Sequence, residues 1–107
     1  MSELTYAGKA FVFRVDNGVV FRNTYAADGA TLHHETLEGP TKGAEETVTL
    51  HSAEVDPGLF MHGWVETSGM TITHLMNLNS HTVHAFCTYE AGDGRVAELH
   101  TGTLEPA

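Results

Sequence analysis

The sequence predicts an all-β protein that folds as a single eight-stranded antiparallel up-and-down barrel over residues 1–107. Short runs that alternate apolar and polar residues recur along the chain, and glycine-rich turns of two to four residues join most of them. No stretch shows the apolar spacing of an amphipathic helix with a helix cap. A flat sheet of eight strands would expose two edges and one apolar face. Closure into a barrel is therefore the economical arrangement.

The first two predicted strands cover residues 9–15 and 18–25 and meet at Asp16-Asn17-Gly18. Asn-Gly favours a tight hairpin turn because both residues tolerate a positive φ. Aromatic and β-branched residues alternate with polar ones in both strands. We therefore expect the odd-numbered residues to face the interior, among them Phe13 and Phe21.

Residues 30–36 form a weaker predicted strand whose facing is ambiguous: if Leu32 points inward, so does His34. Residues 37–44 hold two glycines and a proline, which predicts a loop. Asp56-Pro57-Gly58 predicts a further tight turn. Apart from the central hairpin, the remaining predicted strands cover residues 45–55, 81–90 and 95–104.

The central hairpin, residues 59–78, carries the main functional signal. A glycine turn separates two arms of strand length, and alternation gives each arm one mainly apolar face. These faces hold Phe60, His62, Trp64 and Glu66 on the first arm, and Met70, Ile72, His74 and Met76 on the second. Ionisable groups on apolar faces indicate a site. The alternative is that Glu66 lies in solvent at the turn and the histidines are hydrogen-bonded core residues.

The chain is acidic, with 14 Asp and Glu against five Lys and Arg and a formal net charge of −9. This charge repels phosphate backbones and anionic lipids, so we expect neither a nucleic-acid partner nor a membrane partner. No apolar run approaches the roughly 20 residues of a membrane span, and M-S-E-L-T-Y at the N-terminus is unlike a signal peptide, which predicts a cytoplasmic protein. A single cysteine, Cys87, excludes an internal disulfide.

Three segments carry a family resemblance: F-V-F-R-V-D-N-G-V-V-F at 11–21, G-W-V-E-T-S-G at 63–69 and M-T-I-T-H-L-M-N-L at 70–78. They resemble the MoaF-like domains, which are small lipocalin-like (calycin) barrels, and are distantly similar to the phenolic acid decarboxylases. The resemblance implies a barrel with a ligand pocket, and it gives Glu66 the place of an inward catalytic glutamate.

The decarboxylases also use tyrosines of the first strand and an arginine of the third. Those tyrosine positions hold Phe13 and Val15 here, and residues 30–38 contain no arginine. Without phenols and a guanidinium to hold a substrate carboxylate, we do not expect hydroxycinnamate decarboxylation.

From these residues we expect a barrel that binds a small apolar or aromatic molecule. Glu66 and His74 are the predicted catalytic pair of a cofactor-independent lyase or isomerase. A carboxylate beside Trp64 would lose hydration, which suits it to proton transfer near neutrality. The residues predicted to line the ligand pocket are Phe13, Phe21, Phe60, His62, Trp64, Ile72 and His84.

Neither a metal nor another cofactor is expected. His62, His74, His84 and Glu66 could converge across three strands, but the chain has no H-x-H or H-E-x-x-H signature. The alternative function is a non-catalytic ligand carrier or a homodimeric accessory domain. Small antiparallel barrels commonly bury an apolar outer patch against a second copy, so a homodimer is the expected assembly in that case.

Overall fold

The computed structural model describes residues 5–107, so most of the N-terminal segment considered above, residues 1–4, lies outside the described residues. The elements are all strands: β1 (Ala10–Val15), β2 (Val20–Tyr25), β3 (Thr31–Glu38), β4 (Glu45–Thr49), β5 (His51–Asp56), β6 (Leu59–Val65), β7 (Thr71–Asn77), β8 (Thr82–Glu90) and β9 (Arg95–Pro106). Within residues 5–107 no helix is long and apolar enough to cross a membrane.

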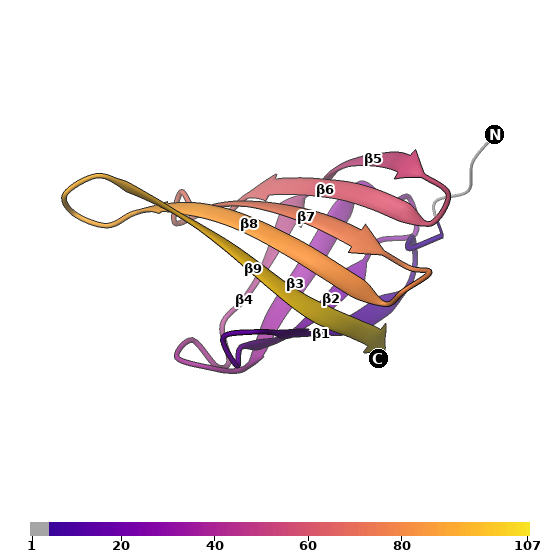
Figure 1. Cartoon of the computed structure of the whole chain (residues 1–107), viewed down its shortest axis with the longest axis horizontal. Coiled ribbons are helices and arrows are strands. Elements are labelled where there is room, and N and C mark those ends of the chain that lie inside the picture. The colour runs from indigo at the N-terminus through magenta and orange to yellow at the C-terminus, as the bar shows by residue number, and fades with distance from the viewer. Residues whose placement is uncertain (1–4) are drawn as a thin grey trace.

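All nine strands belong to one antiparallel sheet with the order β4-β3-β2-β1-β9-β8-β7-β6-β5. The sheet curls into a nearly closed barrel, which Figure 1 shows with β6–β9 in front of β2–β4. At the seam, the turn after β6 reaches β4: the backbone N–H and the hydroxyl of Thr67 both donate to Glu46 Oε2, at 2.7 and 2.6 Å. The all-β barrel expected from the sequence is thereby confirmed.

Within residues 5–107 the strands number nine rather than eight, because the predicted strand at 45–55 is divided at Leu50. Before this residue the chain pairs with β3, ending at Thr31↔Thr49, and after it the chain pairs with β6, starting at His51↔Gly63. Leu50 itself is buried, and its N–H donates to the Ala30 carbonyl at 2.9 Å. The chain thus passes from one edge of the sheet to the other at Leu50, which brings the two edges together.

One end of the barrel is packed with aromatic side chains. Tyr6, which precedes β1, is fully buried and donates a hydrogen bond from its hydroxyl to the Gly29 carbonyl at 3.0 Å. Its ring packs edge-on against Tyr25 and Phe60, with centroids 5.1 and 5.0 Å apart. Edge-to-face contacts of this kind add to the stabilisation from burial. This end of the lumen therefore holds core and leaves no room for a ligand.

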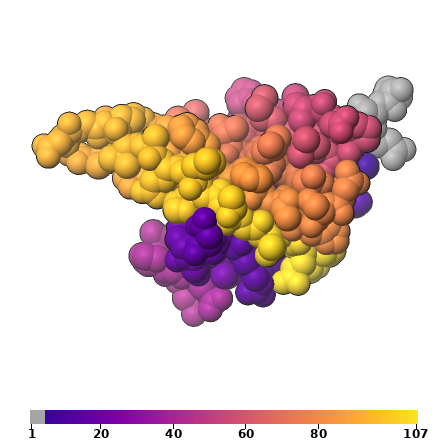
Figure 2. All heavy atoms as spheres, viewed as in Figure 1, coloured from indigo at the N-terminus to yellow at the C-terminus, as the bar shows by residue number. Residues whose placement is uncertain are grey.

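The β8–β9 hairpin projects well beyond the barrel, on the left of Figures 1 and 2. It is the reason for the elongated shape, with extents of 45 × 23 × 22 Å. Its two strands remain paired from Thr82↔Thr103 out to Glu90↔Arg95. The inner face of this long hairpin extends one wall of the open end.

Substitution of Gly102 should destabilise the barrel. Gly102 pairs with Val15 where β9 crosses β1, and a Cβ atom there would overlap the Arg14 carbonyl oxygen. We expect Gly102→Ala to lower the free energy of unfolding by about 2 kcal/mol, as overpacking does. The matched control is Gly63→Ala, whose Cβ would meet its nearest neighbour at an ordinary 3.8 Å. Urea unfolding measures both, and equal effects would contradict a special role for Gly102.

Candidate functional site

A cavity of about 330 Å³ occupies the open end of the barrel. This volume lies at the lower end of the range for small-molecule sites. Its walls are mainly apolar and come from β1 to β3 and β6 to β9. The apolar walls include Phe13, Phe21, Trp64, Met70, Ile72 and Val83, and the polar side chains that enter it include Asn23, His34, Glu66, His74, Glu98 and His100.

Six of the nine residues expected at the site line this cavity: Phe13, Phe21, Trp64, Glu66, Ile72 and His74. Phe60 and His62 do not. They lie on the expected inner face of β6 but nearer the closed end, where both are fully buried in the core. His84 also differs from the expectation, because it pairs with the outward Leu75 and is exposed. The alternation pattern could not reveal this, because apolar residues occur near His84 at both odd and even positions and so do not distinguish the inner face from the outer face.

Glu66 lies beside a histidine that was not among the site residues expected from the sequence. Its Oε2 atom accepts a hydrogen bond from Trp64 Nε1 at 3.1 Å and lies 3.5 Å from His34 Nε2. The Glu66 and His34 side chains are only 18% and 13% exposed. His34 comes from β3, across the seam from the end of β6. The available signal was weak: His34 shares the facing of Leu32, which is fully buried.

His74 lies deeper than this pair, between two aromatic rings. Its ring centroid is 4.8 Å from that of Trp64 and 5.4 Å from that of Phe13. Desolvation, with smaller contributions from His62 and His34, lowers the pKa of His74 to about 3. His74 is therefore a neutral imidazole at physiological pH and presents one hydrogen-bond donor and one acceptor.

Three buried polar atoms that belong to cavity-lining residues have no hydrogen-bond partner within the described part of the chain: Asn23 Oδ1, His34 Nε2 and His74 Nδ1. Leaving a buried polar atom unpaired costs about 1–3 kcal/mol. All three residues line one mainly apolar cavity, which therefore indicates a place for a molecule that can satisfy these atoms. Asn23 in particular offers a carbonyl oxygen, which accepts a hydrogen bond from a hydroxyl or an N–H group.

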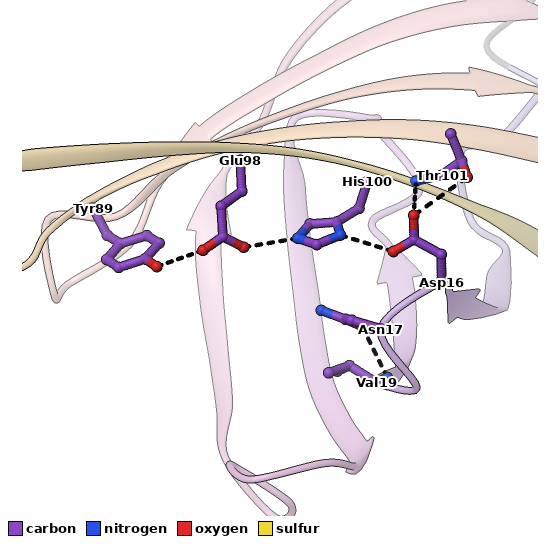
Figure 3. A network of polar contacts seen from close by, with 7 residues as sticks. All are labelled: Asp16, Asn17, Val19, Tyr89, Glu98, His100 and Thr101. Atoms are coloured by element: carbon purple, nitrogen blue, oxygen red, sulfur yellow. Dashed lines mark hydrogen bonds and ion pairs between the residues drawn. The ribbon is translucent and has the colours of Figure 1, made fainter.

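A polar network runs along the wall of the open end (Figure 3). The Tyr89 hydroxyl donates to Glu98, whose other oxygen contacts His100 Nε2 at 2.8 Å. His100 Nδ1 contacts Asp16 at 2.7 Å, and Asp16 also accepts from the Thr101 N–H at 3.0 Å. The network ties the projecting hairpin to the turn between β1 and β2. None of its members was identified as a site residue from the sequence.

The network fixes the charges of its members. Hydrogen bonds that the His100 ring donates to Glu98 and then to Asp16 raise the pKa of His100, which favours the imidazolium form. The bond from Tyr89, followed by that from His100, lowers the pKa of Glu98. The backbone N–H of Thr101 and the His100 side chain lower the pKa of Asp16. One cation is thus shared between two carboxylates.

One cluster of side chains offers atoms of the kind that coordinate a metal cation. Ligand atoms of His34, Glu46 and Glu66 all lie within 4.8 Å of one another. His34 and Glu46 are direct partners in the β3–β4 register, and Glu66 joins them across the seam. Carboxylate oxygens and an imidazole nitrogen suit several divalent ions, although these distances would have to contract for direct coordination.

The chain was compared with protein families, with curated proteins and with solved structures. A model of the MoaF-like family matches residues 7–104. A solved structure described as a "putative beta-lactamase from Burkholderia vietnamiensis" is 24% identical in sequence, with a TM-score of 0.88 and 100% of both chains covered. At that identity the likeness concerns the fold alone. The search of curated proteins found no match.

Acid should destabilise the fold between about pH 7 and pH 5. Burial lowers the pKa of His62 to about 4 and that of His74 to about 3, against an ordinary value of 6.5. The unfolded chain therefore binds protons more readily below pH 6.5, and each of these histidines costs about 2 kcal/mol of stability by pH 5. His100 has the opposite effect. Because its pKa is raised, its contribution to the stability of the fold is complete below pH 6.5 and is lost as the pH rises.

Two such histidines outweigh one, so the melting temperature should fall from pH 7 to pH 5. His74→Gln should flatten this slope, whereas substitution of His51, which is exposed, should leave it unchanged. Scanning calorimetry across this range makes the measurement. A melting temperature that stays level or rises on acidification would contradict the buried, neutral state of His62 and His74.

Proposed function

The chain belongs to the MoaF-like family, and we propose that it binds a small, flat, mainly apolar or aromatic molecule in the open end of its barrel. The unpaired atoms of Asn23, His34 and His74 are the observation that carries this proposal. Aromatic walls would supply the contact area, and the polar atoms would fix the orientation of a ligand bearing a hydroxyl, carbonyl or N–H group.

The second part of the proposal is cofactor-independent proton transfer, of lyase or isomerase type. Glu66 would act as the acid/base, since Trp64 Nε1 holds one of its oxygens and leaves the carboxylate directed at the cavity. His34 replaces His74 as the proposed partner. It lies 3.5 Å from Glu66, whereas His74 is the deeper residue and remains neutral. A proton taken from a ligand carbon by Glu66 could return to another atom of the same ligand.

The β-lactamase description of the solved structure is not carried over to this chain. Serine β-lactamases acylate a serine in an S-x-x-K motif, and this sequence contains no such motif. Among the described residues, those that line the cavity include neither serine nor lysine. A nucleophilic serine mechanism therefore has no candidate residues at this site.

A non-catalytic carrier or a homodimeric accessory domain is the alternative function, and one observation favours a second copy. Large apolar side chains are 37–65% exposed on the outer face of β6 to β9, and two pairs are register partners: Met61 with Leu75, and Phe86 with Leu99. A copy of the chain seated there would bury them. Cytoplasmic residence is kept as part of the proposal for both alternatives.

Small phenols and enones should raise the melting temperature, because a ligand that binds only the folded state stabilises it by mass action. Ala85→Leu should weaken the binding at least about tenfold, since Ala85 lines the cavity between His74 and His100 in the sheet register. Ala97→Leu is the matched control, at an exposed position outside the lining. Thermal-shift titration measures both variants. An unchanged affinity of Ala85→Leu would place the ligand elsewhere.

Glu66→Gln separates an enzyme from a carrier. In an enzyme, the loss of the ionisable oxygen should reduce turnover of a bound enone by about 100-fold or more while the dissociation constant changes little. His34→Gln should act in the same direction. Exchange of the ligand's acidic hydrogens for deuterium, followed by NMR, measures the proton transfer directly. Exchange at the rate of the wild type in Glu66→Gln would favour the carrier.

A further inference from the structure

The charges around the cavity define the ligand class more narrowly than its apolar walls do. Two carboxylates, Glu66 and Glu98, belong to the lining, and Glu46 lies beside Glu66 at the seam. Glu98 shares the His100 imidazolium with Asp16. These four carboxylates outnumber the one imidazolium, and buried His74 stays neutral, so the open end carries a net negative charge.

No arginine or lysine of the chain offsets this charge inside the cavity. All five basic residues lie within residues 5–107, and none of them is among the lining residues. Arg14 pairs with Glu105 and Arg22 with Glu35, and both arginine side chains are exposed. Arg95 donates to the Gly69 carbonyl at 2.7 Å. An anionic ligand would therefore find no free cationic group.

The His100 imidazolium at the cavity wall already has carboxylate partners. Both ring nitrogens of His100 contact carboxylates, at 2.7 and 2.8 Å, which leaves neither nitrogen for a ligand. By contrast, Glu66 has a side chain only 18% exposed, and within residues 5–107 neither arginine nor lysine contacts it; its nearest basic neighbour is His34 Nε2 at 3.5 Å. A carboxylate in such surroundings attracts a cation more strongly than one in water, because the local dielectric is lower.

We propose that the cavity selects a small aromatic ligand carrying a positively charged nitrogen, such as an amine or amidine, which Glu66 binds while Trp64 and Phe13 enclose the ring. The inference rests on the proposed ligand-binding function and specifies its substrate class. A hydroxycinnamate is disfavoured for the same reason, because it would bring a carboxylate up to Glu66 and Glu98. The aromatic walls favour the same choice, since a cation is attracted to the face of an aromatic ring.

Benzamidine, benzamide and benzoate test this selection, because they share a flat shape and differ in charge from positive through neutral to negative. Calorimetric titration at low salt, in buffer with EDTA so that no metal ion occupies the His34–Glu46–Glu66 cluster, gives the three dissociation constants. We expect benzamidine to bind at least about tenfold more tightly than benzamide, and benzoate to bind least. Glu66→Gln should reduce the benzamidine preference to a few-fold.

Glu38→Gln is the matched control, because it changes the net charge equally at an exposed position outside the cavity lining. It should leave the order and the ratios unchanged. Benzoate binding as tightly as benzamidine, or a preference that survives in Glu66→Gln, would overturn the charge selection while leaving the ligand-binding function in place. Failure of all three compounds to bind would instead overturn the proposed function, and this inference with it.

Discussion

Closure of the sheet at Leu50 is the constraint on which the site depends. The chain leaves β3 and joins β6 at this residue, so the edges of the sheet meet and the end of β6 lies against β3 and β4. The two hydrogen bonds from Thr67 to Glu46 hold this seam. Glu66 and His34 are 32 positions apart in the chain, and only closure brings them within 3.5 Å of each other. In an open sheet, Glu66 would keep its hydrogen bond from Trp64 but would lie far from His34.

The barrel divides its interior into a packed half and an empty half, and residue size explains the division. Bulky rings, among them Tyr6, Tyr25 and Phe60, fill the closed end. His62, His74 and Ala85 are register partners on the neighbouring strands β6, β7 and β8. Ala85 lies toward the open end, and its small side chain leaves the space that a larger residue would fill. A cavity beside a close-packed core is costly unless something occupies it. The buried atoms without partners in the same cavity point to the same conclusion.

The histidines take opposite protonation states because their surroundings differ. His62 and His74 lie among apolar rings, where burial disfavours the charged form. His100 is also inward-facing, but two carboxylates contact its ring and favour the charged form. His74 therefore keeps the floor of the cavity neutral, while the acidic groups set the charge of its upper part. This separation explains how a cavity with mainly apolar walls can still discriminate by ligand charge.

The sequence by itself determined the features that depend on neighbours along the chain. Strand alternation has a period of two, so it predicted that Phe13, Trp64, Ile72 and His74 share inward faces, and the Asn-Gly pair predicted the first turn. Tertiary structure decided the rest. Alternation gives the face of a residue but neither its height in the barrel nor the strand across from it, which is why Phe60 and His62 belong to the core. The His34–Glu66 pair and the Asp16–His100 contact join strands distant in the chain, and the sheet register and closure that create them are set by packing over the whole barrel.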